Sequence, residues 1–158
     1  RLWAPATEPF RTLEDEAAGW RDALWADWAA AGEPCERRLV EAADEALGDL
    51  PSTQGEPVLL HQDLHGDNVL SSDREPWLAI DPKPLLGERE LAVAPIVRDF
   101  QLGTSRKQVL DRFDRLTAEL ALDRDRALGW TIAQTIAWAF SSGHAEQHYE
   151  TVRHLLDR

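Results

Sequence analysis

Apolar residues recur at helical spacing twice within the first fifty positions of the chain. The first stripe, which lasts until Gly32, is formed by Leu13, Ala17, Trp20, Leu24 and Trp28. The second stripe follows Pro34 and is formed by Leu39, Ala43, Leu47 and Leu50. Thr12, with Asp15 three residues later, resembles a capping box at the start of the first stripe. The pattern predicts two amphipathic helices, the second closed by Pro51 and a polar turn at residues 52–55.

Short apolar runs replace the helical period in the middle of the chain. Residues 58–60, 69–70 and 77–80 are continuous apolar stretches of strand length, and the polar residues 71–75 separate the last two. Such runs, bounded by turn residues, predict strands, and the 71–75 segment predicts a hairpin turn.

The helical period returns after Gly87 and continues to the end of the chain. It predicts a helix near residues 91–102 and three further helices. The stripes of these three are Val109, Phe113, Leu116 and Leu120; Leu128, Ile132, Thr135, Ile136, Ala139 and Phe140; and Ala145, Tyr149, Val152 and Leu156. Asp123 is expected to cap the middle one. Tryptophans at helical spacing are assigned to the core rather than to a sugar-stacking platform. The expected fold is mainly α with a small β-hairpin (α+β).

Composition supports one domain over residues 1–158 and limits the classes of molecule that the domain is expected to bind. The 43% hydrophobic content can fill a single core, and the net charge of -12 repels nucleic acid and anionic membranes. That charge favours a cationic small molecule, although solubility alone also explains an acidic surface. Cys35 is the single cysteine, and the sequence shows no apolar run of about eighteen residues and no leader pattern. The expected location is the cytoplasm.

The candidate chemistry lies between His61 and Asp81. Residues 61–68 read HQDLHGDN, in which Asp63 and Asn68 have the spacing of the kinase catalytic loop, His-x-Asp-x-x-x-x-Asn. Asp81 follows the apolar run 77–80, where kinases carry a metal-binding aspartate. Phosphoryl transfer needs a carboxylate beside the acceptor hydroxyl and oxygen ligands that hold Mg2+ on the triphosphate. These residue types meet that need.

The same segments carry a resemblance to a known family. Residues 61–70, together with REPWLAIDPKP at residues 74–84, resemble the streptomycin 6-kinase and hydroxyurea phosphotransferase family of aminoglycoside/hydroxyurea antibiotic phosphotransferases. The resemblance spans the chain. It implies the C-terminal lobe of a protein-kinase-like fold that transfers phosphate from ATP to an alcohol group. The implied acceptor is an aminoglycoside such as streptomycin, or a related small molecule, and the implied outcome is antibiotic inactivation.

The resemblance also implies roles for single residues. Asp63 is the expected catalytic base or hydroxyl-orienting group, and Asn68 and Asp81 are the expected Mg2+ ligands, with ATP as co-substrate. His61 is expected to brace the loop. Lys83, within the Asp-Pro-Lys that distinguishes this branch, is a candidate phosphate contact, and an exposed lysine without function is its alternative.

Two segments depart from the family pattern. Gln62 stands where related phosphotransferases mostly have Gly, and residues 87–90 read GERE where many relatives show Gly-Asp-Pro. The second departure leaves the substrate-side loop open. Asp67, Glu88 and Glu90 are expected near the mouth of the site, where they would meet amines of a cationic sugar.

Two parts of a complete kinase are missing from the sequence. The nine glycines include no Gly-x-Gly pair, and Lys83 and Lys107 are the only lysines. Both lysines follow the catalytic loop, so neither is the strand lysine that precedes it in kinases. Arg1 to Trp3 also read like the tail of an element that began upstream. The N-terminal nucleotide-covering lobe is therefore expected outside this chain, and the chain alone is expected to bind ATP poorly.

Other interpretations of the same residues remain open. Asp63, His65 and Asp67 alternate as metallophosphoesterase ligands on a strand would, although the later segments of that signature are missing. A kinase-like lobe can also be a catalytically silent interaction module. His144, His148 and His154 form a conceivable ligand set, for which partly packed or solvated side chains are the simpler interpretation.

Overall fold

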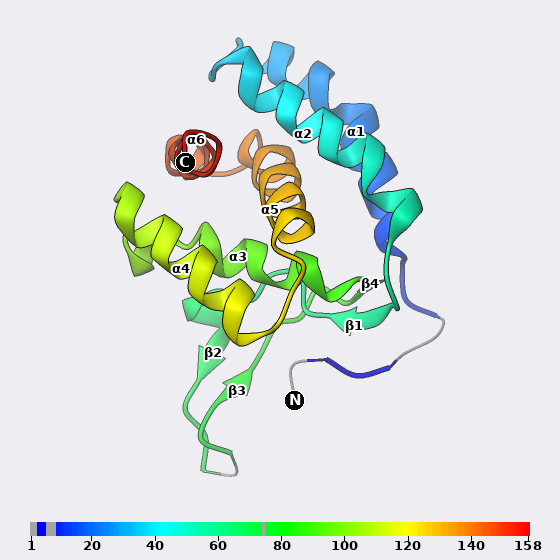
Figure 1. Ribbon diagram of the computed structural model, residues 1–158, viewed down its shortest axis with the longest axis vertical. Coiled ribbons are helices and arrows are strands. Elements are labelled where there is room, and N and C mark those ends of the chain that lie inside the picture. The colour runs from blue at the N-terminus through cyan, green and yellow to red at the C-terminus, as the bar shows by residue number, and fades with distance from the viewer. Residues whose placement is uncertain (1–2, 6–8, 74) are drawn as a thin grey trace.

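Long helices occupy both ends of the chain, and short strands occupy its middle (Figure 1). The computed structural model describes residues 3–5, 9–73 and 75–158, so residues 1–2 and Arg74 of the second motif segment lie outside it. The α-helices are α1 (Leu13–Ala30), α2 (Arg37–Asp49), α3 (Ala94–Val97), α4 (Arg106–Glu119), α5 (Arg124–Ala139) and α6 (Ala145–Leu156). The predicted mainly helical class with a β-hairpin is confirmed.

The capping residues that begin three of the long helices are visible in the sequence. The Thr12 side chain accepts a hydrogen bond from the backbone N–H of Asp15 at 3.1 Å, and α1 starts one residue after Thr12. Asp123 accepts from two backbone N–H groups at the start of α5, as predicted. A capping box of Ser105 and Gln108 starts α4. Each cap satisfies donors that would otherwise lack a partner in the first helical turn.

Helix α5 forms the centre of the core. It packs against α1, α2, α3, α4 and α6, and Figure 1 shows it between the α1–α2 pair and the remaining helices. Its buried residues lie on all sides of the helix, from Ala127 through Trp130 and Ile136 to Ala139. A helix that is apolar all round must be covered by others. Gln134, with no exposed surface, is a polar exception that matters below.

The described strands form two antiparallel pairs. β1 (Val58–Leu60) pairs with β4 (Leu85–Gly87), and β2 (Val69–Leu70) pairs with β3 (Leu78–Ala79). The β2–β3 hairpin was predicted, and it projects from the helical body (Figure 1). Strand β4 was not predicted, and its pairing with β1 across the 61–84 segment is what identifies it as a strand. Pairing β1 with β4 brings the two ends of the 61–84 segment together.

The single helix predicted near residues 91–102 is wrong. The segment consists of the 3-10 turn η3 (Arg89–Val93), the four-residue α3 and the 3-10 turn η4 (Phe100–Leu102). Pro95 lies in the first turn of α3, and Asp99 has an extended backbone and caps η4. Because Asp99 also accepts a hydrogen bond from the backbone N–H of Gly66, tertiary contact holds the break in the helix.

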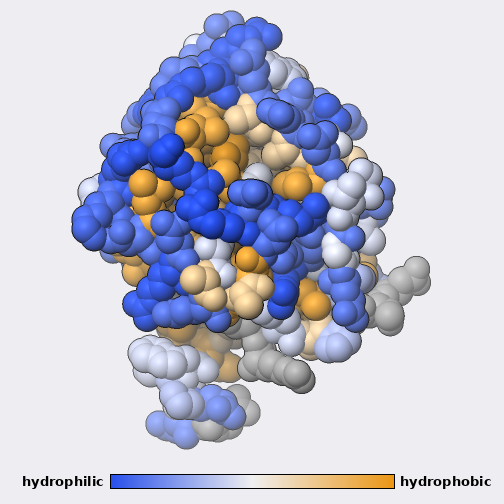
Figure 2. All heavy atoms as spheres, viewed as in Figure 1, coloured by the Kyte–Doolittle hydropathy of each residue, from blue (hydrophilic) through white to orange (hydrophobic). Residues whose placement is uncertain are grey.

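Polar residues cover most of the face shown in Figure 2, with apolar side chains visible in the recesses between them. Large apolar side chains are exposed on the hairpin, where 70% of Trp77 is exposed and Leu70 and Leu78 are also exposed. Within the described residues, no helix combines the length and apolar character that crossing a membrane requires.

Candidate active site

The loop between β1 and β2 carries the first motif segment, and the second segment lies along it. The ring Nε2 of His61 is 2.8 Å from the carbonyl oxygen of Ile80, and the Lys83 N–H donates to the His61 carbonyl at 3.0 Å. At the other end of the loop, the Ile80 N–H donates to the Asn68 carbonyl at 2.9 Å. The loop and the 80–83 segment are thus held side by side.

Asp63 lies in the wall of a cavity of about 540 Å³. Its side chain is 14% exposed, so the carboxylate is reachable from the cavity but mostly enclosed. Oδ2 is in contact with the ammonium group of Lys83. Oδ1 is 4.0 Å from the guanidinium of Arg98 and 4.0 Å from Nε2 of His65. A carboxylate with neighbours on both oxygens is held in one orientation, as a group that receives or directs a hydroxyl proton requires.

Asn68 and Asp81 supply oxygen donors on adjacent segments. The buried Asn68 side chain donates from Nδ2 to the Asp63 carbonyl at 2.8 Å, and its Nδ2 is 3.2 Å from Nε2 of His65. This leaves the amide oxygen as the end of the side chain that can bind a cation. Asp81 is exposed and adopts φ 51°. An amide oxygen and a carboxylate match the hard oxygen ligands that Mg2+ prefers, so the donor set fits that ion.

Gln62 adopts a backbone conformation that suits the glycine found at this position in most relatives. Its φ is 64°, in the left-handed region that favours glycine. The Gln62 side chain is buried, and the Gln62 backbone carbonyl accepts a hydrogen bond from Nε2 of Gln134 at 3.3 Å. A glycine would adopt this φ without strain, whereas glutamine is held there by contacts. Unusual backbone geometry of this kind is often found beside functional groups.

Arg98, Asp99 and Gln134 are site residues that the sequence analysis missed. Arg98 is buried beneath the cavity, and its Nη1 donates to Oε1 of Gln134 at 2.5 Å. Burial lowers the pKa of the Arg98 guanidinium to about 10, against the opposing effects of Asp63 and Asp99. It therefore remains charged at neutral pH. The sequence signal that could have found Arg98 and Asp99 is their position directly after the apolar stretch 91–97. Charged residues beside a buried segment need partners within the protein.

Aromatic and histidine side chains also line the cavity. Trp138 of α5 lines it, together with Phe100 and His144, whose ring centroids are 4.3 Å apart. The assignment of tryptophans to the core holds for Trp28 and Trp130, which are buried. Trp138 instead faces the site. His148 also lines the cavity, and burial lowers its pKa to about 4, with smaller effects from Arg98 and His144.

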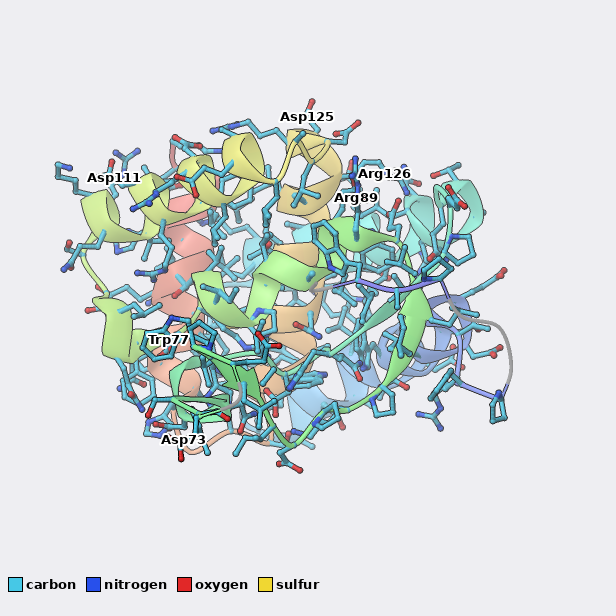
Figure 3. All side chains as sticks on the ribbon, turned by 90° about the horizontal axis from the view of Figure 1, so that it is seen from below. Asp73, Trp77, Arg89, Asp111, Asp125 and Arg126 are labelled. Carbon is cyan, nitrogen blue, oxygen red and sulfur yellow. The ribbon has the colours of Figure 1, made fainter. Side chains whose placement is uncertain are left out.

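Of the three carboxylates predicted at the mouth, only Asp67 lines the Asp63 cavity. Asp67 is exposed and accepts a hydrogen bond from Nε2 of Gln101 at 2.9 Å. Glu88 and Glu90 instead line a separate cavity of about 820 Å³ together with Arg89 and Arg126. Figure 3 shows Arg89 and Arg126 close together, away from Trp77 of the hairpin.

The placement of Glu88 and Glu90 at the catalytic mouth is therefore corrected. Glu88 is 2% exposed and accepts hydrogen bonds from Arg126 at 2.7 to 3.1 Å, and the Trp130 indole N–H contacts the same carboxylate. Glu90 accepts from the backbone N–H of Asp123 at 3.3 Å. These carboxylates tie helix α5 to the segment that precedes α3. The local sequence could not reveal this, because the partners lie more than thirty residues away.

The metallophosphoesterase interpretation loses its geometric basis. Asp63 and His65 lie in a loop, and Asp67 lies in the 3-10 turn η2 (Gly66–Asn68), so the three side chains do not alternate along a strand. Within residues 3–5, 9–73 and 75–158, no group of three or more His, Cys, Asp and Glu side chains is arranged to hold a metal ion.

Comparison with known proteins identifies one family model and several curated relatives that are similar to the chain. The family model described as aminoglycoside/hydroxyurea antibiotic resistance kinase matches residues 1–144. The chain is 39% identical to a hydroxyurea phosphotransferase of Kitasatospora aureofaciens over 87% of its length. It is 37% and 38% identical to the streptomycin 6-kinases of Streptomyces griseus and Streptomyces glaucescens, over 88% and 89% of its length.

These alignments cover only part of each relative. They span 40% of the hydroxyurea phosphotransferase and 48% of each streptomycin 6-kinase, so the chain corresponds to less than half the length of these proteins. No solved structure matches the chain significantly.

Proposed function

Because the chain belongs to the aminoglycoside/hydroxyurea antibiotic resistance kinase family, we propose that it is the catalytic and substrate-binding lobe of an ATP-dependent phosphotransferase. The acceptor is a hydroxyl group of a small molecule such as streptomycin, another aminoglycoside or hydroxyurea. The observation that carries the proposal is the Asp63 carboxylate in a cavity wall, fixed beside Asn68 and the 80–83 segment.

In the proposed reaction, the acceptor oxygen attacks the γ-phosphorus of ATP. The bond from that phosphorus to the β–γ bridging oxygen breaks, ADP leaves, and the acceptor proton passes to Asp63. Asn68 and Asp81 are the residues that would hold Mg2+, which when bound neutralises charge on the phosphates. The chain supplies the orientation of the acceptor hydroxyl, which accounts for much of the catalysis in phosphoryl transfer.

Asp67 and Lys83 are proposed to contact the two substrates. The Asp67 carboxylate is exposed at the cavity rim, where it suits a cationic group of the acceptor. The Lys83 ammonium lies against Asp63, at the place where the transferred phosphoryl group must arrive. An ammonium group there would offset the charge that phosphoryl transfer brings to the site.

The fold of a protein-kinase C-terminal lobe and the need for a second lobe are also part of the proposal. The chain contains no Gly-x-Gly pair to cover phosphates, and its two lysines both contact carboxylates, Lys83 with Asp63 and Lys107 with Asp111. The relatives are more than twice as long as the region they share with this chain. A nucleotide-covering lobe elsewhere in the full-length protein would complete the site.

A coupled assay of ATP consumption by the full-length protein tests the proposal. Streptomycin, other aminoglycosides, hydroxyurea and simple amino alcohols are offered in turn, with Mg2+ present. Consumption that depends on one acceptor, and a phosphorylated product found by mass spectrometry, are the expected results. Absence of acceptor-dependent turnover across the panel would favour the catalytically silent module.

The metal ligands have a separate test in the same assay. Asp81→Asn is expected to raise the Mg2+ concentration needed for half-maximal rate by about tenfold or more, because one ligand loses its charge. Asp73→Asn, in the exposed hairpin turn, is the matched control. An unchanged Mg2+ requirement in Asp81→Asn would remove Asp81 from the ligand set.

A further inference from the structure

Two cations face Asp63, and they differ in how firmly they are held. The side chain of Arg98 is 6% exposed, whereas that of Lys83 is 52% exposed. Arg98 approaches Oδ1, and Lys83 contacts Oδ2. The two oxygens of the candidate base therefore have a buried neighbour on one side and an accessible neighbour on the other.

Arg98 is fixed by contacts that do not involve Asp63. Its guanidinium donates to Gln134 and lies 4.8 Å from the centroid of the Trp138 ring. Gln134 in turn donates to the Gln62 carbonyl, one residue before Asp63. The chain of contacts from helix α5 thus reaches both the backbone beside the base and a cation facing its carboxylate. These contacts hold the Arg98 side chain in one orientation.

Among the described residues, Lys83 has contacts at its backbone and at the end of its side chain. The backbone N–H donates to the His61 carbonyl, and the ammonium group contacts Asp63 and lies 5.5 Å from the Trp138 ring centroid. The flexible four-carbon stem of a lysine lets its charge move several ångströms while the backbone stays in place. The ammonium can therefore leave Oδ2 without any change in the loop.

We propose that the two cations divide the work around Asp63. Arg98 is a positioning residue that holds the carboxylate toward the cavity throughout the reaction. Lys83 covers Oδ2 before the substrates bind, then moves to the γ-phosphoryl group and leaves Oδ2 free to accept the hydroxyl proton. This inference rests on the proposed phosphotransferase function and extends it to a residue, Arg98, that no sequence motif marked.

The charges involved favour this exchange. In phosphoryl transfer, negative charge spreads over three oxygens of the transferred group, and a nearby cation stabilises it. A lysine that stayed on Oδ2 would compete with the hydroxyl proton for the same oxygen. Arg98 cannot make the exchange, because its guanidinium is bound to Gln134 and enclosed by the protein.

Substitutions of Lys83 in the full-length protein test the moving cation. Lys83→Ala is expected to lower kcat by about 100-fold, in the range found when one charge-stabilising group is removed, with ADP affinity unchanged. Lys83→Arg should recover part of the loss, because it keeps a cation on a long side chain. Lys107→Ala, whose lysine pairs with Asp111 on exposed α4, is the matched control. A kcat within twofold of wild type in Lys83→Ala would overturn this half of the proposal.

Substitutions of Arg98 test the fixed cation. Arg98→Ala is expected to lower kcat by about 10- to 100-fold with little change in the KM for ATP, because a misplaced base affects the chemical step. Added guanidinium ion should restore part of kcat. Arg98→Lys keeps a cation in the interior if the alanine variant folds poorly. Arg126→Gln, at the Glu88 cavity, controls for loss of a partly buried arginine and should lower Tm without lowering kcat.

A double-substitution cycle separates this inference from the function on which it rests. If Arg98 acts through Asp63, Arg98→Ala should have little further effect on kcat in the Asp63→Asn background. Additive losses would overturn the positioning role while leaving phosphotransfer intact. Wild-type kcat in Asp63→Asn alone would instead refute the proposed function, and the inference with it.

Discussion

Asp63 and Glu88 are both enclosed carboxylates paired with arginine, yet their surroundings differ. Glu88 is 2% exposed and binds Arg126 through both oxygens, and the Trp130 indole and the Gly55 N–H complete its contacts. Asp63 has its arginine only at 4.0 Å, and an exposed lysine covers its other oxygen.

The difference separates a carboxylate that is fully bound within the protein from one that a substrate can reach. Glu88 uses its oxygens within the protein, so a ligand would have to break existing bonds to reach it. Asp63 faces a cavity and is covered by a side chain that can move. A buried ion pair with all its bonds made is costly to break. An incompletely bonded carboxylate is available to a substrate.

Removing the charge on Asp63 is expected to have the largest effect of the substitutions that test this comparison. Asp63→Asn is expected to lower kcat of the full-length protein by about 10²- to 10⁴-fold, the usual contribution of a general base. Its Tm should fall less than that of a Glu88 variant, because the partners of Asp63 are distant or exposed. Steady-state kinetics and thermal unfolding measure both effects. Asp111→Asn, on exposed α4, is the control, and equal kcat in the two variants would contradict the assignment.

The reciprocal change is expected to affect stability rather than catalysis. Glu88→Gln leaves Arg126 without its charged partner and should lower the free energy of unfolding by about 3 kcal/mol. The kcat of the folded protein should stay near wild type, because Glu88 does not line the Asp63 cavity. Chemical denaturation measures the first quantity. Glu56→Gln, which changes an exposed carboxylate in the same cavity, should have no such effect. A kcat loss confined to Glu88→Gln would return Glu88 to the catalytic site.

His148 lines the Asp63 cavity, whereas the described lining residues of the Glu88 cavity include no histidine. His148 therefore makes stability depend on pH at the Asp63 cavity. The pKa of His148 falls from 6.5 to about 4 on folding, so the unfolded chain binds a proton first as the pH drops. The stability contributed by the neutral ring is full above pH 6.5 and is lost between pH 6.5 and 4.

This titration should cost about 2 kcal/mol of unfolding free energy between pH 7 and pH 5. Denaturation curves across that range measure the loss, and His148→Leu should reduce the pH dependence. The same slope in wild type and variant would show that His148 is not the group responsible.

The smallest effect concerns the backbone of the catalytic loop. Gln62→Gly relieves a left-handed conformation but removes a buried side chain, so the free energy of unfolding should change by less than about 1 kcal/mol. Glu33 has φ 55° and an exposed side chain. Glu33→Gly should therefore raise the free energy of unfolding by about 1 kcal/mol, because no buried side chain is lost. Equal gains in the two variants would show that the buried Gln62 side chain contributes nothing.

Several parts of the fold could be predicted because their signals are local. Thr12 and Asp123 cap the helices that they were expected to cap, and the stripes of α1, α2, α4, α5 and α6 pack as predicted. The residues of the loop at 61–68 could be singled out because their spacing matches that of a kinase catalytic loop. The helix expected at 91–102 could not be divided correctly, because the hydrogen bond from Gly66 to Asp99 spans 33 positions.

By itself, the sequence determined the catalytic-loop motif, the order of helices and the family resemblance, since these depend on residue types at short spacing. Only the tertiary structure decided that Arg98 faces Asp63, that Trp138 lines the cavity, and that Glu88 is a structural partner of Arg126. The physical reason is that burial and charge pairing depend on which distant segments pack together. Spacing along the chain does not carry that information.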